Sequence, residues 1–309
     1  MHEAPDDVAE ADVLDLVCRH WRAGVDEVAH VPVGFGAWHW RATAGGESAL
    51  FVTLDRLAGR HTAISLEAAY RSAADLVVAG DFVLAPLPSG DRSMTVALGG
   101  DRLSVTPWID GNSGDGDLPD AIAAGQTAAM LAALHTTPVP LGLPVWRPLV
   151  DAGLPQRLAE QTRGPWDGGP YGERARAALS DRVADVSSWV GRYLDLAART
   201  DPATWVATHG EPHTRNQLRT RDGRTLLVDW ESLKLAPRER DLRFLVEQGY
   251  GSSCRADPSL VEMFDLEWRL DEVAQYATWF HAPHTGTESD RVALGGLLHE
   301  LDRPAGRTS

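Results

Sequence analysis

The segment that decides the fold reads Thr208-His209-Gly210-Glu211-Pro212-His213-Thr214-Arg215-Asn216, and Leu226-Leu227-Val228-Asp229-Trp230-Glu231 follows it. Its first residues end a short apolar run, and the polar part presents a carboxylate, two imidazoles and an amide. A second apolar run then delivers Asp229. Short apolar runs bounded by turn residues are typical of buried strands. The sequence therefore predicts two strands that bring Glu211, Asn216 and Asp229 together.

These three side chains suit phosphoryl transfer. Asn216 and Asp229 offer hard oxygen ligands to Mg²⁺, which takes few protein ligands and completes its shell with substrate phosphates. Glu211 is a separate carboxylate that can accept a proton from a hydroxyl. Phosphoryl transfer needs this combination of positioning and charge neutralisation. Asp229 as a mere strand-end cap is the alternative, and its pairing with Asn216 favours a metal ligand.

Outward from this segment, the N-terminal third predicts a small strand-rich lobe. Helices are expected at 8–23 and 63–79, a hairpin within 31–40, and strands at 50–54, 94–98 and 103–108. The polar, glycine-rich stretch 109–116 marks the best domain boundary. Helices are then expected at 119–135, at 174–198 and over most of 241–301. We predict an N-terminal lobe at 1–108 and a helical lobe at 109–309.

Composition narrows the class of protein. The chain has 309 residues, 43% of them hydrophobic, and a formal net charge of -15. This is enough apolar material for one large or two modest domains, and it argues against disorder. The net negative charge opposes nucleic-acid binding. With two cysteines, an acidic N-terminus and no long apolar run, the sequence predicts a cytoplasmic protein without membrane or nucleic-acid partners.

Four other enzyme classes fit the sequence poorly. Lys234 is the only lysine and lies between two leucines, which excludes a Walker A nucleotide-binding loop. His209 and His213 are spaced like zinc ligands, but Gly210 and Pro212 oppose the helix that such a site requires. No Gly-x-Ser-x-Gly elbow is present, and His39 stands where a dinucleotide fingerprint needs its third glycine. A loop of purely structural role remains an alternative.

The motif pair resembles the catalytic and metal-binding loops of aminoglycoside phosphotransferases, within the protein-kinase-like superfamily. That family writes the first loop His-Gly-Asp-x-His-x-x-Asn and ends the next strand in Asp. The continuation Ala236-Pro237-Arg238-Glu239-Arg240-Asp241-Leu242 is similar to its spectinomycin-type branch. The resemblance extends from about Val31 to the C-terminal helices. It implies an α+β, protein-kinase-like two-lobed fold, with a small antiparallel-sheet N-lobe and a larger helical C-lobe.

The resemblance also implies roles for individual residues. Asn216 and Asp229 would hold Mg²⁺, and Glu211 would take the catalytic carboxylate position. His209 and His213 would brace the loop, with Asp241 holding it through backbone amides. The segment 103–108, with Thr106 and Trp108, would lead into the hinge that meets the nucleotide base. Gly34, Phe35 and Gly36 would form a reduced hairpin over the phosphates. ATP or GTP is the implied co-substrate.

The sequence departs from the family pattern at two positions. Thr53 stands where the family carries a lysine on the third strand, and Glu211 replaces an aspartate. Glu67 on the following helix, the possible lysine partner, is expected to be a solvated residue. The possible replacements for the lysine are Arg41, Arg56 and Arg60. A kinase-like protein that binds nucleotide or ligand without efficient turnover is therefore the alternative function.

The expected acceptor is a cationic, hydroxylated small molecule of the aminoglycoside or aminocyclitol kind, an activity associated with antibiotic resistance. Acidic residues concentrate in the segment 262–272, and Trp268, Trp279 and Phe280 lie nearby. A wall of one charge would raise the local concentration of a polycation. The favoured interpretation is nevertheless a solvated helix face, with the aromatic residues in the core.

Overall fold

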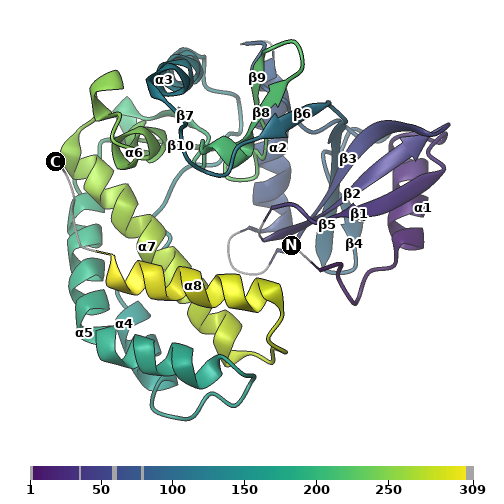
Figure 1. The fold of residues 1–309 in the computed structure, drawn as a ribbon. Coiled ribbons are helices and arrows are strands. Elements are labelled where there is room, and N and C mark those ends of the chain that lie inside the picture. Colours follow the sequence, from purple (N-terminus) through teal and green to yellow (C-terminus); the bar gives the residue numbers. More distant parts are fainter. Residues whose placement is uncertain (1–2, 35, 58–60, 78–79, 304–309) are drawn as a thin grey trace. The chain divides into compact units, whose positions relative to one another are not determined.

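The computed structural model describes residues 3–34, 36–57, 61–77 and 80–303 (Figure 1). The chain divides into two compact units, Met1–Val145 with Trp205–Cys254, and Trp146–Thr204 with Arg255–Ser309. Every residue of the predicted catalytic and metal loops belongs to the first unit. The lobe boundary expected between residues 108 and 109 stays a prediction.

The first unit opens with a five-stranded antiparallel sheet in the order β1-β2-β3-β5-β4. Its strands are β1 (Glu27–Val31), β2 (Ala37–Ala44), β3 (Glu47–Asp55), β4 (Val96–Leu98) and β5 (Asp101–Pro107). One face forms a hydrophobic cluster with Val13 and Val17 of α1 (Glu10–His20). The strand residues in that cluster are Val28, Trp40, Ala42, Leu50, Val52, Leu54, Leu103 and Val105.

The opposite face of this sheet is polar. Because successive side chains of a strand point to opposite faces, the residues between the cluster members share the second face. They include His39, Thr53, Asp55 and Ser104. Helix α2 (Ala63–Leu76) contacts this side, since the Tyr70 hydroxyl donates to the Asp55 carboxylate at 2.8 Å. The second face is therefore the one available to a polar ligand.

The rest of the first unit consists of short strands and helices. The sheet β6-β8-β9 contains Gly111–Ser113, Gln217–Thr220 and Thr225–Leu227, and β7 (Val206–Thr208) pairs with β10 (Lys234–Ala236). The helical elements are α3 (Ala121–Thr136), η3 (Thr214–Asn216), α6 (Glu239–Glu247) and η4 (Gly251–Ser253). Val83, between α2 and β4, forms a parallel bridge with Leu227. This bridge joins the segment before the sheet's last two strands to the strand that delivers Asp229.

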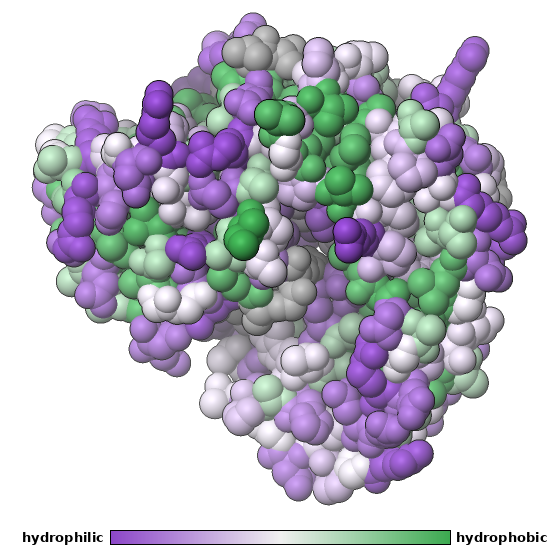
Figure 2. Space-filling view, turned by 180° about the vertical axis from the view of Figure 1, so that it is seen from behind, coloured by the Kyte–Doolittle hydropathy of each residue, from purple (hydrophilic) through white to green (hydrophobic). Residues whose placement is uncertain are grey.

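The second unit is helical. It contains α4 (Leu154–Gln161), α5 (Gly172–Ala197), η2 (Pro202–Thr204), α7 (Pro258–His281) and α8 (Glu288–Asp302). Together with the N-terminal antiparallel sheet, these helices confirm the predicted α+β, kinase-like fold class. Among the described residues, no helix has the length and hydropathy to span a bilayer. The face drawn in Figure 2 mixes hydrophilic and hydrophobic residues.

The acidic stretch 262–272 does not form a uniformly solvated helix face. Glu267 is buried and accepts hydrogen bonds from the Trp146 indole at 2.9 Å and from the Tyr193 hydroxyl. Glu262 pairs with Arg192 at 2.6 Å, and Asp265 pairs with Arg303 at 2.7 Å. Much of the negative charge in this stretch is thus engaged within the second unit, and Phe280 is fully buried there.

Candidate phosphotransfer site

The predicted catalytic loop is a tight turn held by hydrogen bonds to a buried carboxylate. Asp241, fully buried at the start of α6, accepts the backbone N–H groups of His209 at 3.0 Å and Gly210 at 2.6 Å. It also bonds His135 of α3 at 2.9 Å. Hydrogen bonds to a charged, buried acceptor are among the stronger ones. Asp241 therefore fixes the backbone directly before Glu211.

Gly210 is required by the shape of this turn. Its φ is +98°, in the left-handed region that strains residues with a side chain. A Cβ at this position would lie 2.2 Å from Nη2 of Arg240. The Arg240 guanidinium in turn donates to the Thr208 hydroxyl at 3.1 Å. The loop thus passes closely over an arginine that the sequence did not single out.

His209 links the catalytic loop to the strand that carries Asp229. Its Nε2 lies 2.8 Å from the carbonyl oxygen of Val228, and its Nδ1 lies 3.3 Å from the Glu211 backbone nitrogen. Burial lowers the pKa of His209, so the ring is neutral and can donate from one nitrogen while accepting at the other. Trp230 packs edge-on against it with ring centroids 4.7 Å apart.

Asn216 and Asp229 lie on neighbouring backbones. The Val228 N–H donates to the Asn216 carbonyl at 3.0 Å, and the Asn216 amide nitrogen donates to the Glu211 carbonyl at 3.1 Å. This second bond leaves the Asn216 Oδ1 as the atom available to a cation. Asp229 has a φ of +68°, uncommon for a residue with a side chain. Strain of this kind is often found at functional sites, where the surrounding structure maintains it.

Negative charge concentrates in this cluster. Asp229 is accessible, yet the protein around it desolvates the carboxylate and, with the charges of Glu211 and Asp55, raises its pKa to about 6. The Glu211 carboxylate lies 3.7 Å from Nε2 of His213, and both side chains are partly exposed. No cluster of three or more His, Cys, Asp or Glu able to hold a metal occurs in the part of the chain that the structure describes.

The residues predicted to meet the nucleotide lie on the five-stranded sheet and its hairpin. Gly34 and Gly36 have φ of +70° and +98°, and they flank Phe35, which lies outside the described residues. Thr106 is paired with Phe51 near the end of β5. The Trp108 backbone N–H donates to Ala49 at 3.1 Å. Gly34 and Gly36 thus belong to the hairpin predicted to cover the phosphates. Thr106 and Trp108 belong to the segment predicted to contact the nucleotide base.

Comparison with known proteins decides the family. The model of the phosphotransferase enzyme family, APH, matches residues 29–283. The chain belongs to this family. Its membership makes the chain a phosphotransferase, as the sequence predicts. A curated relative, protein StrN of Streptomyces griseus, is 28% identical over 240 residues, which cover 73% of each chain.

Solved structures of similar fold are also found. Spectinomycin phosphotransferase APH(9)-Ia, solved with ADP and spectinomycin, aligns with a TM-score of 0.73 and 18% identity over 97% of each chain. Amicoumacin kinase hAmiN, solved in complex with AMP-PNP, Ca²⁺ and Ami, aligns with a TM-score of 0.61 and 13% identity over 96% of this chain and 95% of that one. At these identities the likeness shows the fold, including the two-part kinase-like architecture.

An acidic group beside the predicted metal-binding loop of this phosphotransferase was not predicted from the sequence. Asp55, 6% exposed at the end of β3, accepts a hydrogen bond from the Tyr70 hydroxyl. Burial and the charge of Glu231 raise its pKa to about 7. Burial and the neighbouring Asp229 likewise raise the pKa of Glu231. The sequence signal that could have identified Asp55 is a carboxylate at the end of an apolar strand, two residues after Thr53.

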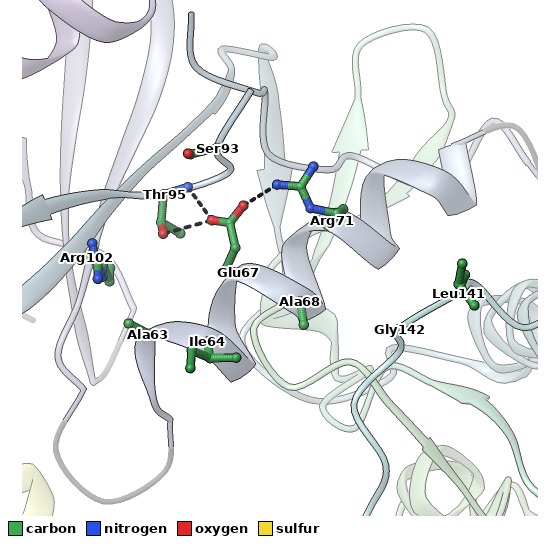
Figure 3. Close-up of a pocket in the computed structure, with 10 residues that line it drawn as sticks. All are labelled: Ala63, Ile64, Glu67, Ala68, Arg71, Ser93, Thr95, Arg102, Leu141 and Gly142. Atoms are coloured by element: carbon green, nitrogen blue, oxygen red, sulfur yellow. Dashed lines mark hydrogen bonds and ion pairs between the residues drawn. The ribbon is translucent and has the colours of Figure 1, made fainter. Parts of the chain in front are cut away.

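Glu67 differs from its expected role. Its carboxylate accepts the backbone N–H group of Met94 at 2.8 Å. It also accepts the backbone N–H group of Thr95 at 3.0 Å and pairs with Arg71 (Figure 3). It therefore anchors the segment before β4 to α2, so the prediction of a solvated helix residue is wrong. This contact borders a pocket of about 600 Å³ lined by α2, residues 93 and 95, Arg102 and the loop at 141–142.

Proposed function

We propose that this chain transfers the γ-phosphoryl group of ATP or GTP to a hydroxyl of a small aminoglycoside-like or aminocyclitol-like molecule. The observation that carries the proposal is the connected geometry of Glu211, Asn216 and Asp229. One loop supplies the first two, and the Val228 to Asn216 backbone bond places the third beside them. Their closeness along adjacent backbones supports the separate roles that we assign to them in phosphoryl transfer.

In the proposed reaction Glu211 accepts the proton of the acceptor hydroxyl. The acceptor oxygen forms a bond to the γ-phosphorus, and the bond from that phosphorus to the bridging oxygen breaks, leaving the nucleoside diphosphate. Glu211 is one methylene longer than the family's aspartate. The hydrogen bond from the Asn216 amide to the Glu211 carbonyl holds its backbone, and the hydrogen bonds from the His209 and Gly210 N–H groups to Asp241 hold the backbone directly before it. Such fixed positioning contributes much of the rate in this chemistry.

The donor set fits Mg²⁺. Asn216 Oδ1 and the Asp229 carboxylate are hard oxygen ligands, and Mg²⁺ commonly takes one or two carboxylates plus substrate phosphates. When bound, the ion would neutralise phosphate charge. The raised pKa of Asp229 supports this assignment, because a cation would compensate a desolvated carboxylate surrounded by acidic neighbours.

The acceptor class rests on similarity and charge. The fold neighbour APH(9)-Ia was solved with spectinomycin. The formal net charge of -15 favours a cationic acceptor over an anionic one. The contacts of Glu262, Asp265 and Glu267 described above reduce the support from the 262–272 stretch, so overall charge carries this part of the proposal.

A second candidate is a protein that binds nucleotide without efficient turnover. The observation favouring it is Thr53, whose hydroxyl stands at the lysine position and contacts His39 at 3.2 Å. Lysine at this position would add a positive charge that threonine lacks. Under this alternative the phosphates bind, but their transfer is slow.

One experiment separates the two candidates. ADP or GDP release would be measured with Mg²⁺ across aminoglycosides, aminocyclitols and uncharged polyols, together with mass spectrometry of the acceptor. Asp229→Ala should abolish phosphorylated product, whereas Asp222→Ala, an exposed carboxylate in the β8–β9 turn, should retain it. Nucleotide binding without any product would support the binding protein. Full activity of Asp229→Ala would refute the metal assignment.

A further inference from the structure

His39 and Thr53 form a fixed cross-strand pair on the polar face of the five-stranded sheet. They are directly opposite each other in the β2–β3 register, and His39 Nδ1 lies 3.2 Å from Thr53 Oγ1. The imidazole also stacks on Phe51, with ring centroids 4.9 Å apart and planes inclined by 27°. Two neighbours thus hold the ring in one orientation, beside the residue that replaces the family's lysine.

The other ring nitrogen faces the hairpin expected to cover the phosphates. A Cβ on Gly34 would meet Nε2 of His39 at 3.0 Å. The hydrogen bond between Nδ1 and Thr53 does not involve this second nitrogen. Burial lowers the pKa of His39 to about 3, so the ring is neutral near pH 7 and carries a single N–H.

We propose that His39 binds a nucleotide phosphate oxygen through its Nε2–H group, and that Thr53 positions it by donating a hydroxyl proton to Nδ1. A neutral imidazole has one donor and one acceptor nitrogen, so a hydroxyl that donates to Nδ1 places the ring proton on Nε2. The inference rests on the proposed function, because it requires a nucleotide on this face of the sheet.

The candidate arginines are placed less favourably. Arg56 is engaged by Asp7 at 2.6 Å and by Asp101 at 3.1 Å. Arg60 lies outside the described residues. Arg41 is exposed on the same face as His39, but it is two residues farther along β2 from the hairpin. His39 is therefore the described donor that combines a fixed orientation with proximity to Gly34.

The test is a comparison of three ligands. Dissociation constants for a non-hydrolysable ATP analogue with Mg²⁺, for ADP with Mg²⁺ and for adenosine would be measured by calorimetry. His39→Ala should weaken binding of both nucleotides by on the order of tenfold, the usual effect of losing one hydrogen bond, and leave adenosine unchanged. His39→Gln, which retains an N–H donor, should recover part of the loss. His20→Ala on α1 is the matched control.

Thr53 supplies a second readout. Thr53→Val removes the hydroxyl at nearly constant volume and should weaken nucleotide binding, while Thr53→Ser should retain it. A merely structural role for the pair would not produce this rescue by serine. Arg41→Ala should leave the preference for nucleotide over adenosine unchanged.

Each contrary result has a defined meaning. Nucleotide binding by the wild-type protein with no phosphate-specific loss in His39→Ala overturns this inference alone. An equal loss for adenosine assigns His39 to the base and also overturns it, as does a phosphate-specific loss found in Arg41→Ala instead. Absence of nucleotide binding and turnover in the wild-type protein overturns both this inference and the proposed function.

Discussion

The buried carboxylate of Asp55 leads us to predict that the free energy of unfolding depends on pH. Its carboxylate is 6% exposed and has Glu231 as an acidic neighbour, and its pKa rises from 3.8 to about 7. A raised pKa means that the folded state binds the proton more tightly than the unfolded state. The contribution of protonated Asp55 to stability is therefore complete below pH 3.8 and is lost as the pH rises to about 7.

The magnitude follows from the shift. At 1.36 kcal/mol per pKa unit, a change from 3.8 to about 7 corresponds to a loss of up to about 4 kcal/mol above pH 7. Asp55→Asn is neutral at every pH and can still accept the Tyr70 hydroxyl, so it avoids this loss. The free-energy difference between variant and wild type should grow by about 2.5 kcal/mol from pH 5 to pH 8.

Urea unfolding followed by tryptophan fluorescence at pH 5 and pH 8 measures this difference, since the chain has 11 tryptophans. The measurement is made without Mg²⁺ or nucleotide, which would add their own binding energy. Asp75→Asn, which replaces an exposed carboxylate on α2, is the control. Its free-energy difference from the wild type should be nearly the same at pH 5 and pH 8. A gap that is constant or shrinks from pH 5 to pH 8 would refute the reasoning.

The remaining predictions concern the catalytic loop. Asp241→Asn loses the charge that accepts two backbone amides and His135, so urea unfolding should show a loss of roughly 2–3 kcal/mol, together with lower kcat. An unchanged unfolding midpoint would contradict this. Gly210→Ala puts a side chain on a residue with a φ of +98°, and its Cβ would lie 2.2 Å from Nη2 of Arg240. It should therefore reduce kcat, and it should still do so in the double variant with Arg240→Ala, in which that contact is removed. Full rescue by the double variant would show that backbone strain is unimportant. Glu211→Asp withdraws the carboxylate by about one ångström and should lower kcat by up to about 100-fold with the nucleotide KM unchanged. Equal or higher kcat would show that the loop tolerates either length.

The sequence predicted most of the fold because the hydrophobic periodicity there is strong. The helices expected at 8–23, 63–79, 119–135 and 174–198 are present with ends displaced by a few residues, as α1, α2, α3 and α5. The strands β6, β8 and β10 were not predicted, and β6 lies within the stretch 109–116 that was expected to be a connector. Each contains only three or four residues, too few for an apolar alternation to be recognised.

The candidate site was predictable where motif spacing specifies it and unpredictable where contacts cross the fold. The loop and strand pair placed Glu211, Asn216 and Asp229 from local order alone. The approach of Asp55 to Glu231 and the hydrogen bond from Met94 to Glu67 join residues that are far apart in the sequence. Such contacts between distant residues leave no periodic signal in a single sequence.

Asp55 also connects stability with the proposed reaction. A buried carboxylate beside Glu231 destabilises the free protein near neutral pH, and packing at this position alone would favour a neutral residue. Local conflicts of this kind concentrate at functional sites, because substrates there supply what the free protein lacks. A nucleotide with its divalent cation would bring positive charge to Asp229, whose own pKa is raised partly by Asp55. The carboxylates that cost stability in the free protein would then increase its affinity for the cation. On the proposed function, binding of the nucleotide and its cation would offset the stability cost of an aspartate at a position where asparagine is expected to give a more stable fold.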